Sequence, residues 1–394
     1  MEKAHVNYIL DRRFRANPDY ELIAFDKLND DEKRNLGSLP DGNGELLYGI
    51  FKPKCPNGLT LKAATPDVAL LFYSLREENF LPHYLRNSIS GTFNDELVKL
   101  VLSGVIEVEL NGEFISGSMS YSHLYQDKAP SSSDKKSYLS KLSDDALKYG
   151  ELLNITDTKT LSAHLYNFNR VALSPRWQRL FLNKAAVEEF LGVNSYRILF
   201  DERTSNWMMR PKKSSDRWLF WRKLSKEKNH LRLKTYKLYL SPECQALENT
   251  FPLIYESVTK TNATSFKIGN DGYGLLRPDK IVIYFSDKQD MIKAGQSIKK
   301  IFKELPVHGV PFTSQLDENG LVSWGIDPPS FETQFSWDSL SWRLWVTDRL
   351  SKHLIEAKKN IKSSSREPWE IAKHNLSYEG INVDKWEPAE DLWD

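Results

Sequence analysis

The chain has few of the residues on which metal, redox and disulfide chemistry usually depend. Its 394 residues include only two cysteines and eight histidines. Cys55 and Cys244 lie far apart and belong to no C-x-x-C pair, so they predict neither a disulfide framework nor a zinc site. The histidines are scattered, with no H-x-x-x-H motif and no carboxylate at ligand spacing. We therefore expect no metal ion and no cofactor.

Long apolar runs and the common catalytic motifs are also missing. No apolar run approaches the ~20 residues that a membrane-spanning helix needs. Residues 1–6 lack the basic stretch and apolar run that begin a secretory signal, so we expect a cytoplasmic protein without a membrane partner. There is no Walker A loop and no G-x-S-x-G elbow, and the spacing of Gly269, Gly272 and Gly274 predicts a turn rather than a nucleotide site. The usual signatures of kinases, dehydrogenases and hydrolases are absent.

The composition is that of a globular protein. Hydrophobic residues make up 40% of the chain and aromatic residues 12%, with eleven tryptophans. The length allows two or three domains. The formal net charge is +1, so the chain as a whole has no attraction to nucleic acid, which we expect to be an unlikely partner.

The first 126 residues predict a small helix–hairpin module. An apolar stripe predicts a helix over 66–78, and residues 95–102 predict another. Asn111 and Gly112 separate two runs of alternating polarity, a pattern that predicts a β-hairpin within 105–117. Such a module could clasp a peptide, or it could only pack on the main domain.

The remainder of the chain predicts a larger mixed domain. Residues 127–136 are rich in serine and lysine and predict a linker, so we assign 127–150 to a linker and connecting helix. We assign residues 151–365 to the main domain and 366–394 to an acidic, tryptophan-containing tail, which we expect to be loosely docked from Val383 onward. Strands and helices alternate without a regular βαβ pattern. We therefore predict an α+β fold, with a mostly antiparallel sheet flanked by helices and the smaller helix–hairpin module before it.

One segment breaks the charge balance of the chain. Residues 203–237 hold twelve lysines and arginines against two acids, a local net charge of +10, with three tryptophans interleaved. A run of this kind is either a solvated basic face or a surface for an acidic or phosphate-rich partner. Because it leads into the strand that carries Lys237, we favour a partner that brings negative charge to that strand. Nucleic-acid binding is the third alternative.

Strands predicted at 231–240, 265–268 and 280–285 carry cations and phenols. Strand alternation places Lys237 and Tyr239 on one face and Arg232 and Lys234 on the other. Tyr284 falls on the last of these strands.

A lysine beside a tyrosine, with Lys267 and Arg277 nearby, could form an acid–base site. Neighbouring positive charge and burial lower the pKa of a lysine, which frees some of its amine at neutral pH. An arginine can hold a phosphate with two hydrogen bonds. The structural alternative is that half-buried strands direct lysines and tyrosines to the surface.

Residues 232–350 resemble the HopA-type bacterial effector domain, which also occurs as the lyase chain of some lanthipeptide-making systems. More remotely they are similar to the phosphothreonine lyases of the OspF and SpvC kind. The pieces that carry the resemblance occur in the family's order and cover about a third of the chain. They are Lys237-Leu-Tyr-Leu-Ser-Pro242, Phe266-Lys-Ile268, Arg277-Pro-Asp-Lys-Ile-Val-Ile-Tyr-Phe285, Val310-Pro-Phe-Thr313, Gly320 to Pro328, and Asp338-Ser-Leu-Ser-Trp-Arg343.

The resemblance implies β-elimination of phosphate from phosphothreonine or phosphoserine in a peptide, which gives a dehydroamino acid. Lys237 would be the general base, and Tyr239, which stands where the phosphothreonine lyases carry histidine, the general acid. The implied phosphate-binding residues are Lys267, Arg277, Tyr284 and Arg343. The implied partners are a phosphorylated peptide or protein, such as a lanthipeptide-type precursor, and a kinase. The alternative is a non-catalytic effector or phosphopeptide-binding module.

Overall fold

The computed structural model describes ten stretches of the chain. They are residues 12–36, 47–55, 59–81, 91–120, 136–193, 206–210, 217–224, 234–328, 341–359 and 366–388. The chain divides into two compact units. Unit 1 comprises residues 1–134, 330–339 and 352–379, and unit 2 comprises residues 135–329, 340–351 and 380–394. The segment 352–379, which the sequence analysis divided between the main domain and the tail, thus belongs to unit 1.

Unit 1 contains two small antiparallel sheets and several helices. One sheet has the order β5-β1-β6-β7 and the other the order β2-β3-β4. The strands are β1 (Arg13–Ala16), β2 (Tyr20–Ile23), β3 (Gly49–Pro53), β4 (Lys62–Ala64), β5 (Asn79–Phe80), β6 (Ile106–Leu110) and β7 (Glu113–Ile115). The helices are α2 (Asp30–Leu36), α3 (Pro66–Ser74), α5 (Gly91–Leu102), α16 (Pro368–Tyr378) and the last turns of α15 (Trp342–Lys359).

The predicted hairpin of unit 1 is confirmed. Strands β6 and β7 pair around Asn111 and Gly112, whose φ angles are 54° and 86°. Two successive positive φ angles match the two-residue turn that follows the natural twist of a hairpin. The predicted helices at 66–78 and 95–102 correspond to α3 and α5, and α3 begins at Pro66 with the side chain of Thr65 as its cap.

Unit 2 is built on a seven-stranded sheet in which all neighbouring strands are antiparallel. Its order is β13-β14-β10-β12-β11-β9-β8. The strands are β8 (Trp207–Met209), β9 (Trp218–Lys223), β10 (Tyr236–Leu240), β11 (Ser265–Gly269), β12 (Ile281–Phe285), β13 (Ser314–Gln315) and β14 (Val322–Ile326). Mostly antiparallel sheets with flanking helices confirm the predicted α+β class.

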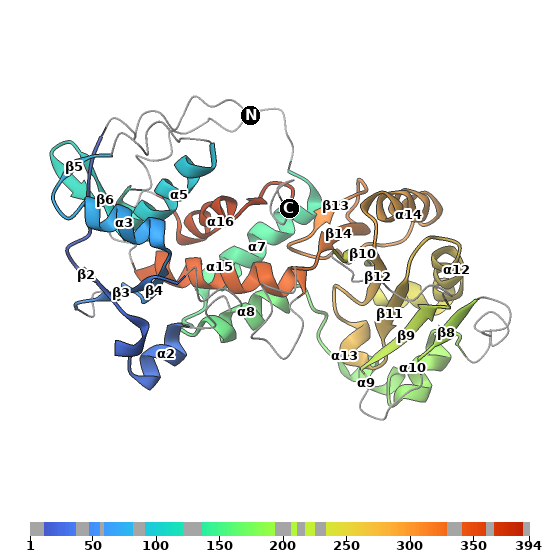
Figure 1. Ribbon diagram of the computed structural model, residues 1–394. Helices are drawn as coiled ribbons and strands as arrows, with labels where there is room; N and C mark the ends of the chain where they lie inside the picture. The colour runs from blue at the N-terminus through green and yellow to red at the C-terminus, as the bar shows by residue number, and fades with distance from the viewer. Residues whose placement is uncertain are drawn as a thin grey trace. The chain divides into compact units, whose positions relative to one another are not determined.

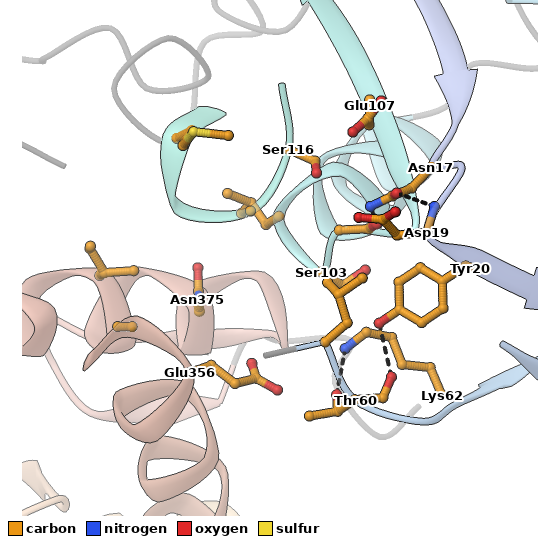
Figure 2. Close-up of a pocket in the computed structure, with 17 residues that line it drawn as sticks. Asn17, Asp19, Tyr20, Thr60, Lys62, Ser103, Glu107, Ser116, Glu356 and Asn375 are labelled. Carbon is orange, nitrogen blue, oxygen red and sulfur yellow. Dashed lines mark hydrogen bonds between the residues drawn. The ribbon is translucent and has the colours of Figure 1, made fainter. Parts of the chain in front are cut away.

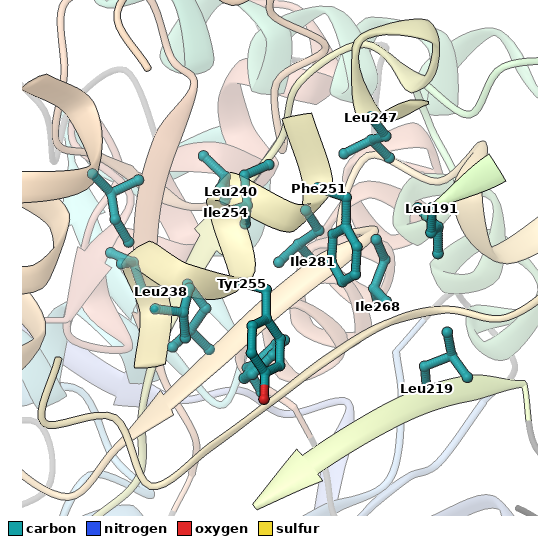
Figure 3. Packing of buried hydrophobic residues seen from close by; sticks show 14 of the residues in the cluster. Leu191, Leu219, Leu238, Leu240, Leu247, Phe251, Ile254, Tyr255, Ile268 and Ile281 are labelled. Carbon is teal, nitrogen blue, oxygen red and sulfur yellow. The ribbon is translucent and has the colours of Figure 1, made fainter. Parts of the chain in front are cut away.

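One face of this sheet forms the main hydrophobic core. Helices α12 (Leu247–Thr259) and α14 (Lys288–Ile301) cover it; α14 lies beside strands β10 and β12, and α12 packs beside α14 (Figure 1). Figure 3 shows Leu238, Ile268 and Ile281 from the sheet packed against Tyr255 and other helix residues. Because side chains of a strand alternate between its two faces, the residues between these apolar ones point to the opposite face of the sheet.

The opposite face carries the polar side chains. Tyr166 of α8 (Thr158–Tyr166) and Arg343 in the first turn of α15 contact Asp279, just before β12, and Ser143 of α7 (Tyr138–Leu152) contacts Phe312. Shorter helices complete the unit: α9 (Pro175–Leu180), α10 (Lys184–Phe190) and α13 (Gly272–Leu275). None of the helices in the described part of the chain is long and apolar enough to cross a membrane.

Several local predictions differ from the structure. The pattern of residues 175–190 predicts one helical segment, but the structure has two helices there, because Asn183 caps the second one. The turn predicted around Gly269 contains the one-turn helix α13. The linker at 127–136 lies, apart from its last residue, outside the described residues.

The tail is folded rather than loosely docked as far as residue 388. Strands β15 (Ile381–Asn382) and β16 (Glu387–Pro388) pair with each other. Between them, Trp386 is 1% exposed, and its ring packs edge-on against Phe312. Burial of an indole of this size explains why an acidic terminus is held in place.

Candidate functional site

The predicted lysines and tyrosines meet on the polar face of the seven-stranded sheet. Lys237 on β10 lies opposite Tyr284 on β12. Tyr239 and Lys267 both lie opposite Val282, from the two neighbouring strands. Directly opposed residues of antiparallel strands point to the same side, so all four side chains share one face. Of the two cations predicted for the other face, Lys234 precedes β10, and Arg232 lies outside the described residues.

Lys237 is held by a carboxylate. Its side chain is 10% exposed, and its Nζ lies 2.6 Å from Oδ1 of Asp327, just after β14. The same carboxylate oxygen accepts a hydrogen bond from the backbone N–H of Trp342 at 3.2 Å. Nζ of Lys237 also lies 5.4 Å from the ring centre of Tyr284. The ammonium group is therefore fixed and has a counter-ion.

Lys267 sits between aromatic rings. Its Nζ lies 4.2 Å from the ring centre of Trp218 and 5.7 Å from that of Tyr284. No carboxylate of the described residues forms an ion pair with it. Burial, followed by the positive charge of Lys237, lowers the pKa of Lys267 to about 8. Lys267 therefore lies near another cation and loses its proton at a lower pH than an ordinary lysine.

The two phenols of this face remain protonated at neutral pH. Burial is the main cause that raises the pKa of Tyr239 and of Tyr284, and the Asp327 carboxylate adds to it. A buried phenol of this kind can donate a hydrogen bond or a proton, but it is a weak acid.

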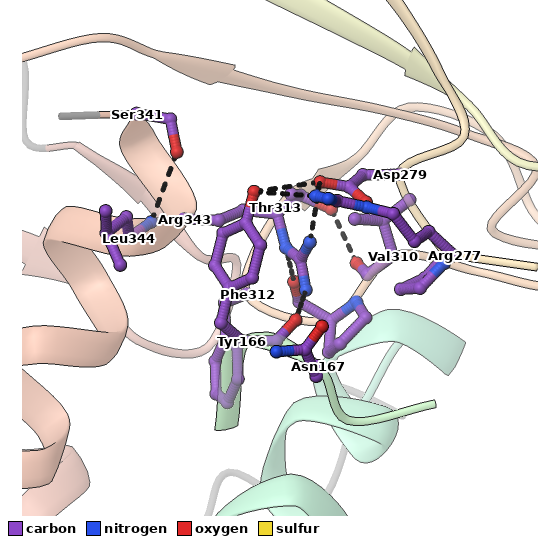
Figure 4. Close-up of polar contacts among 12 residues, drawn as sticks. Tyr166, Asn167, Arg277, Asp279, Val310, Phe312, Thr313, Ser341, Arg343 and Leu344 are labelled. Atoms are coloured by element: carbon purple, nitrogen blue, oxygen red, sulfur yellow. Dashed lines mark hydrogen bonds and ion pairs between the residues drawn. The ribbon is translucent and has the colours of Figure 1, made fainter. Parts of the chain in front are cut away.

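Arg277 belongs to a buried cluster around Asp279 (Figure 4). Its Nε and Nη2 lie 2.7 and 2.8 Å from the two oxygens of Asp279. The hydroxyl of Tyr166 donates to Asp279 at 3.0 Å and accepts from Nη2 of Arg277 at 3.0 Å. Burial alone would raise the pKa of Asp279, but the charges of Arg277 and Arg343 outweigh it and hold that pKa well below its usual range.

Arg343 also contacts this cluster, through Asp279. It is 1% exposed, and its Nη1 lies 3.0 Å from Oδ2 of Asp279. Its other nitrogens donate to the backbone carbonyls of Pro311 at 3.1 Å and Tyr166 at 2.7 Å. Arg343 therefore orients Arg277 through the shared carboxylate.

Pro311, whose carbonyl accepts a hydrogen bond from Arg343, lies in a strained backbone segment. Phe312, the next residue, has a φ angle of 61°, which is rare for a bulky side chain. Its N–H donates to the hydroxyl of Ser143 at 2.8 Å, and its carbonyl accepts from the indole of Trp342 at 2.8 Å. Strained backbone persists where surrounding contacts determine it, and it is often found beside functional sites.

Two cavities, each of about 260 Å³, open beside these residues and share Arg217 and Trp218 in their linings. Lys267 and Tyr284 line the first cavity, and Arg277 lines the second. The two linings together hold five cations and one carboxylate: Arg170, Arg210, Arg217, Lys267, Arg277 and Asp271. The site therefore favours a ligand with more than one negative charge.

Of the six site residues predicted from the sequence, three line these cavities and three do not. Lys237, Tyr239 and Arg343 are buried behind the surface, where they contact or support the others. Their partners Asp327, Asp279 and Tyr166 were not predicted from the sequence. The pocket residues Arg170, Arg210, Arg217 and Trp218 were not singled out either, although the last three lie within the basic, tryptophan-containing segment.

Comparisons with known proteins give only distant similarity. No protein-family model matches the chain, and no curated protein matches it. Among solved structures, an effector protein from Pseudomonas syringae pv. tomato strain DC3000 superposes with a TM-score of 0.43 and 13% identity, over 64% of this chain and 97% of that one. An effector protein from Pseudomonas syringae pv. syringae strain 61 gives 0.39 and 14%, over 64% and 98% of the two chains.

Proposed function

We propose that unit 2 binds a phosphorylated serine or threonine of a peptide and eliminates its phosphate. The observation that carries this proposal is the position of Lys267. Its side chain lines a cavity together with Tyr284 and two arginines, and burial lowers its pKa to about 8. A weakly basic amine inside a cationic cavity suits the removal of a proton next to a bound dianion.

The cations of the two cavities would bind the phosphate. Arg217 is common to both linings, and Arg277 lines the second one. Because Asp279 and Tyr166 already fix the orientation of Arg277, little side-chain entropy would be lost when a phosphate binds. Trp218 would supply an apolar wall for the peptide.

The elimination requires a base at the α-carbon of the substrate. The base takes the Cα proton, and the electron pair of the broken Cα–H bond forms the Cα–Cβ double bond. The Cβ–O bond then breaks, and phosphate leaves with its electron pair. The sequence analysis assigned the base to Lys237. We now favour Lys267, because Lys237 is ion-paired to Asp327 and lines neither cavity. At pH 7, an amine with this pKa is unprotonated in roughly one molecule in ten.

The departing phosphate oxygen needs a proton or a strong hydrogen bond. Two phenols on the same face can supply it: Tyr239, as predicted from the sequence, and Tyr284, which lines the first cavity. Phenylalanine substitution at each position distinguishes them, because the proton donor loses rate with little change in peptide affinity. Since the substrate must already carry phosphate, a kinase has to act before this protein.

Mass spectrometry of a phosphothreonine peptide after incubation with the protein tests the proposal. Elimination removes phosphoric acid, a loss of about 98 Da, whereas hydrolysis removes about 80 Da. A loss of 80 Da would exclude elimination. An unchanged mass together with measurable binding would support the second candidate function, a phosphopeptide-binding module. The neutralisation of Lys237 by Asp327 is the observation that favours this second function.

A further inference from the structure

A fully buried lysine follows the carboxylate that holds Arg277, and the chemistry proposed for unit 2 does not use it. Lys280 is 0% exposed and comes directly after Asp279, just before β12. Its Nζ donates to the backbone carbonyl of Pro242 at 2.9 Å and lies 2.7 Å from Nδ1 of His308. Within the described residues no carboxylate forms an ion pair with this lysine, and burial lowers its pKa to about 7. Lys280 therefore orients a histidine rather than neutralising an acid.

His308 links Lys280 to the loop that follows α8. Its Nε2 contacts the backbone carbonyl of Asn169, which can only accept a hydrogen bond, so Nε2 carries the ring proton. Nδ1 is then the acceptor for the amine of Lys280. Burial, followed by the positive charge of Lys280, lowers the pKa of His308 to about 3, so the ring is neutral at pH 7. Lys280 thus fixes both the tautomer and the orientation of this imidazole.

Asn169 is held through its side chain as well as through its carbonyl. Its side-chain amide donates to the backbone carbonyls of His308 at 2.9 Å and Gly309 at 3.2 Å. The φ angle of Asn169 is 65°, in the left-handed region that asparagine adopts more readily than most residues. Because these contacts hold the backbone in an uncommon conformation, they also set the direction in which the next residue, Arg170, leaves the turn.

Arg170 is one of the cations of the candidate site. It lines the second cavity together with Arg217 and Arg277. Partial burial lowers the pKa of Arg170, and the positive charge of Arg277 adds to this effect. The N–H of the following residue, Val171, donates to the carbonyl of Leu276 at 3.0 Å. Three arginines around one cavity repel one another until an anion binds, and anchored backbone on both sides of Arg170 keeps it there.

We propose that Lys280 and His308 are positioning residues that hold Arg170 at the phosphate site. Lys280 fixes the imidazole, the imidazole fixes the carbonyl of Asn169, and Asn169 sets the place of Arg170. The residue before Lys280 holds Arg277 on the same cavity, so two consecutive residues position two arginines toward one phosphate. This role rests on the function proposed for unit 2, because Arg170 matters only if its cavity binds phosphate.

Calorimetric titration of the full-length protein with inorganic phosphate tests this role, because the protein does not consume this ligand. The wild type should bind with a Kd on the order of 1 mM or tighter, and Arg170→Gln should bind at least about tenfold more weakly. His308→Leu should lose as much affinity. His308→Gln, which keeps a donor for the carbonyl of Asn169, should stay within about threefold of the wild type. Adding His308→Leu to Arg170→Gln should weaken binding no further, because the effect of His308 passes through Arg170.

Tyr20→Phe is the matched control. It removes the 2.8 Å hydrogen bond from a buried hydroxyl to the carbonyl of Thr60, in a polar cavity of unit 1 (Figure 2), and should leave phosphate affinity unchanged. Asn169→Gly is a milder variant for the case that His308→Leu does not fold. Glycine accepts a φ angle of 65°, so only the side-chain contacts are lost, and phosphate should bind about fivefold more weakly. Thermal melting of each variant checks that it is folded.

Two results would overturn the positioning role while leaving the function proposed for unit 2 intact. One is wild-type phosphate affinity in folded His308→Leu or Asn169→Gly. The other is a loss of affinity by His308→Leu that is as large in the Arg170→Gln background as in the wild type. No phosphate binding by the wild type would contradict the proposed function itself, and the positioning role with it.

Discussion

Replacing Asp279 with asparagine should destabilise unit 2 strongly, because both Arg277 and the buried Arg343 contact this carboxylate. The carboxylate is 4% exposed and receives two hydrogen bonds from Arg277, one from Tyr166 and an ion pair from Arg343. Asparagine keeps the shape but removes the charge. The Arg277 side chain, 21% exposed, can turn toward water, whereas that of Arg343, 1% exposed, cannot. Breaking a buried pair in this way costs about 3–5 kcal/mol.

Urea unfolding monitored by tryptophan fluorescence measures this free energy. Glu256→Gln provides the control, since Glu256 forms only an exposed pair with Lys260 on α12 and should cost about 0.3–0.5 kcal/mol. Phosphopeptide binding should also weaken, because Arg277 loses its fixed orientation. If Asp279→Asn lowers the free energy of unfolding by less than about 1 kcal/mol, as loss of a surface ion pair would, the cluster does not stabilise unit 2 as described.

Three further outcomes follow from the described contacts. The pKa of Lys267 predicts that kcat/KM for elimination rises with pH and levels off above about pH 8. Lys237→Met removes a neighbouring positive charge and should move this bend in the profile to higher pH. A pH–rate profile that is unchanged in this variant would argue against Lys267 as the base. Gly325→Ala places a methyl group 2.5 Å from the Trp342 ring and should cost about 1–3 kcal/mol in unfolding free energy; a melting temperature equal to that of the wild type would contradict this packing. Trp386→Ala removes a buried indole and should cost about 3–5 kcal/mol by urea unfolding, whereas a loosely docked tail would lose almost nothing.

The parts of the fold that depend on local pattern were predictable from the sequence. Alternation correctly grouped Lys237 with Tyr239, and the Asn111–Gly112 pair correctly predicted the hairpin. The position of β14 beside β10 was not predictable, because it depends on pairing between residues far apart in the chain. The docking of Trp386 was missed for a similar reason, since its partner Phe312 lies in a distant segment.

Lys267 and Arg277 of the candidate site were predicted from the sequence, whereas Arg170 and the carboxylates were not. Lysines and arginines stand out in a basic run, whereas an isolated aspartate does not. Asp279 lies two residues from Arg277, so their pairing could have been predicted from the sequence. Its contact with Tyr166 spans 113 residues and depends on the tertiary structure. The same applies to Asp327, whose pairing with Lys237 is the reason that we propose Lys267 rather than Lys237 as the base.

The most direct test of the proposed chemistry is a single-turnover reaction of Lys267→Met and Lys237→Met with a phosphothreonine peptide, followed by mass spectrometry. We expect Lys267→Met to bind the peptide within about tenfold of the wild-type affinity and to show no loss of phosphoric acid. Lys237→Met should still form the dehydroamino acid, at a reduced rate. Elimination by Lys267→Met at the wild-type rate, with none by Lys237→Met, would contradict this account and return the role of the base to Lys237.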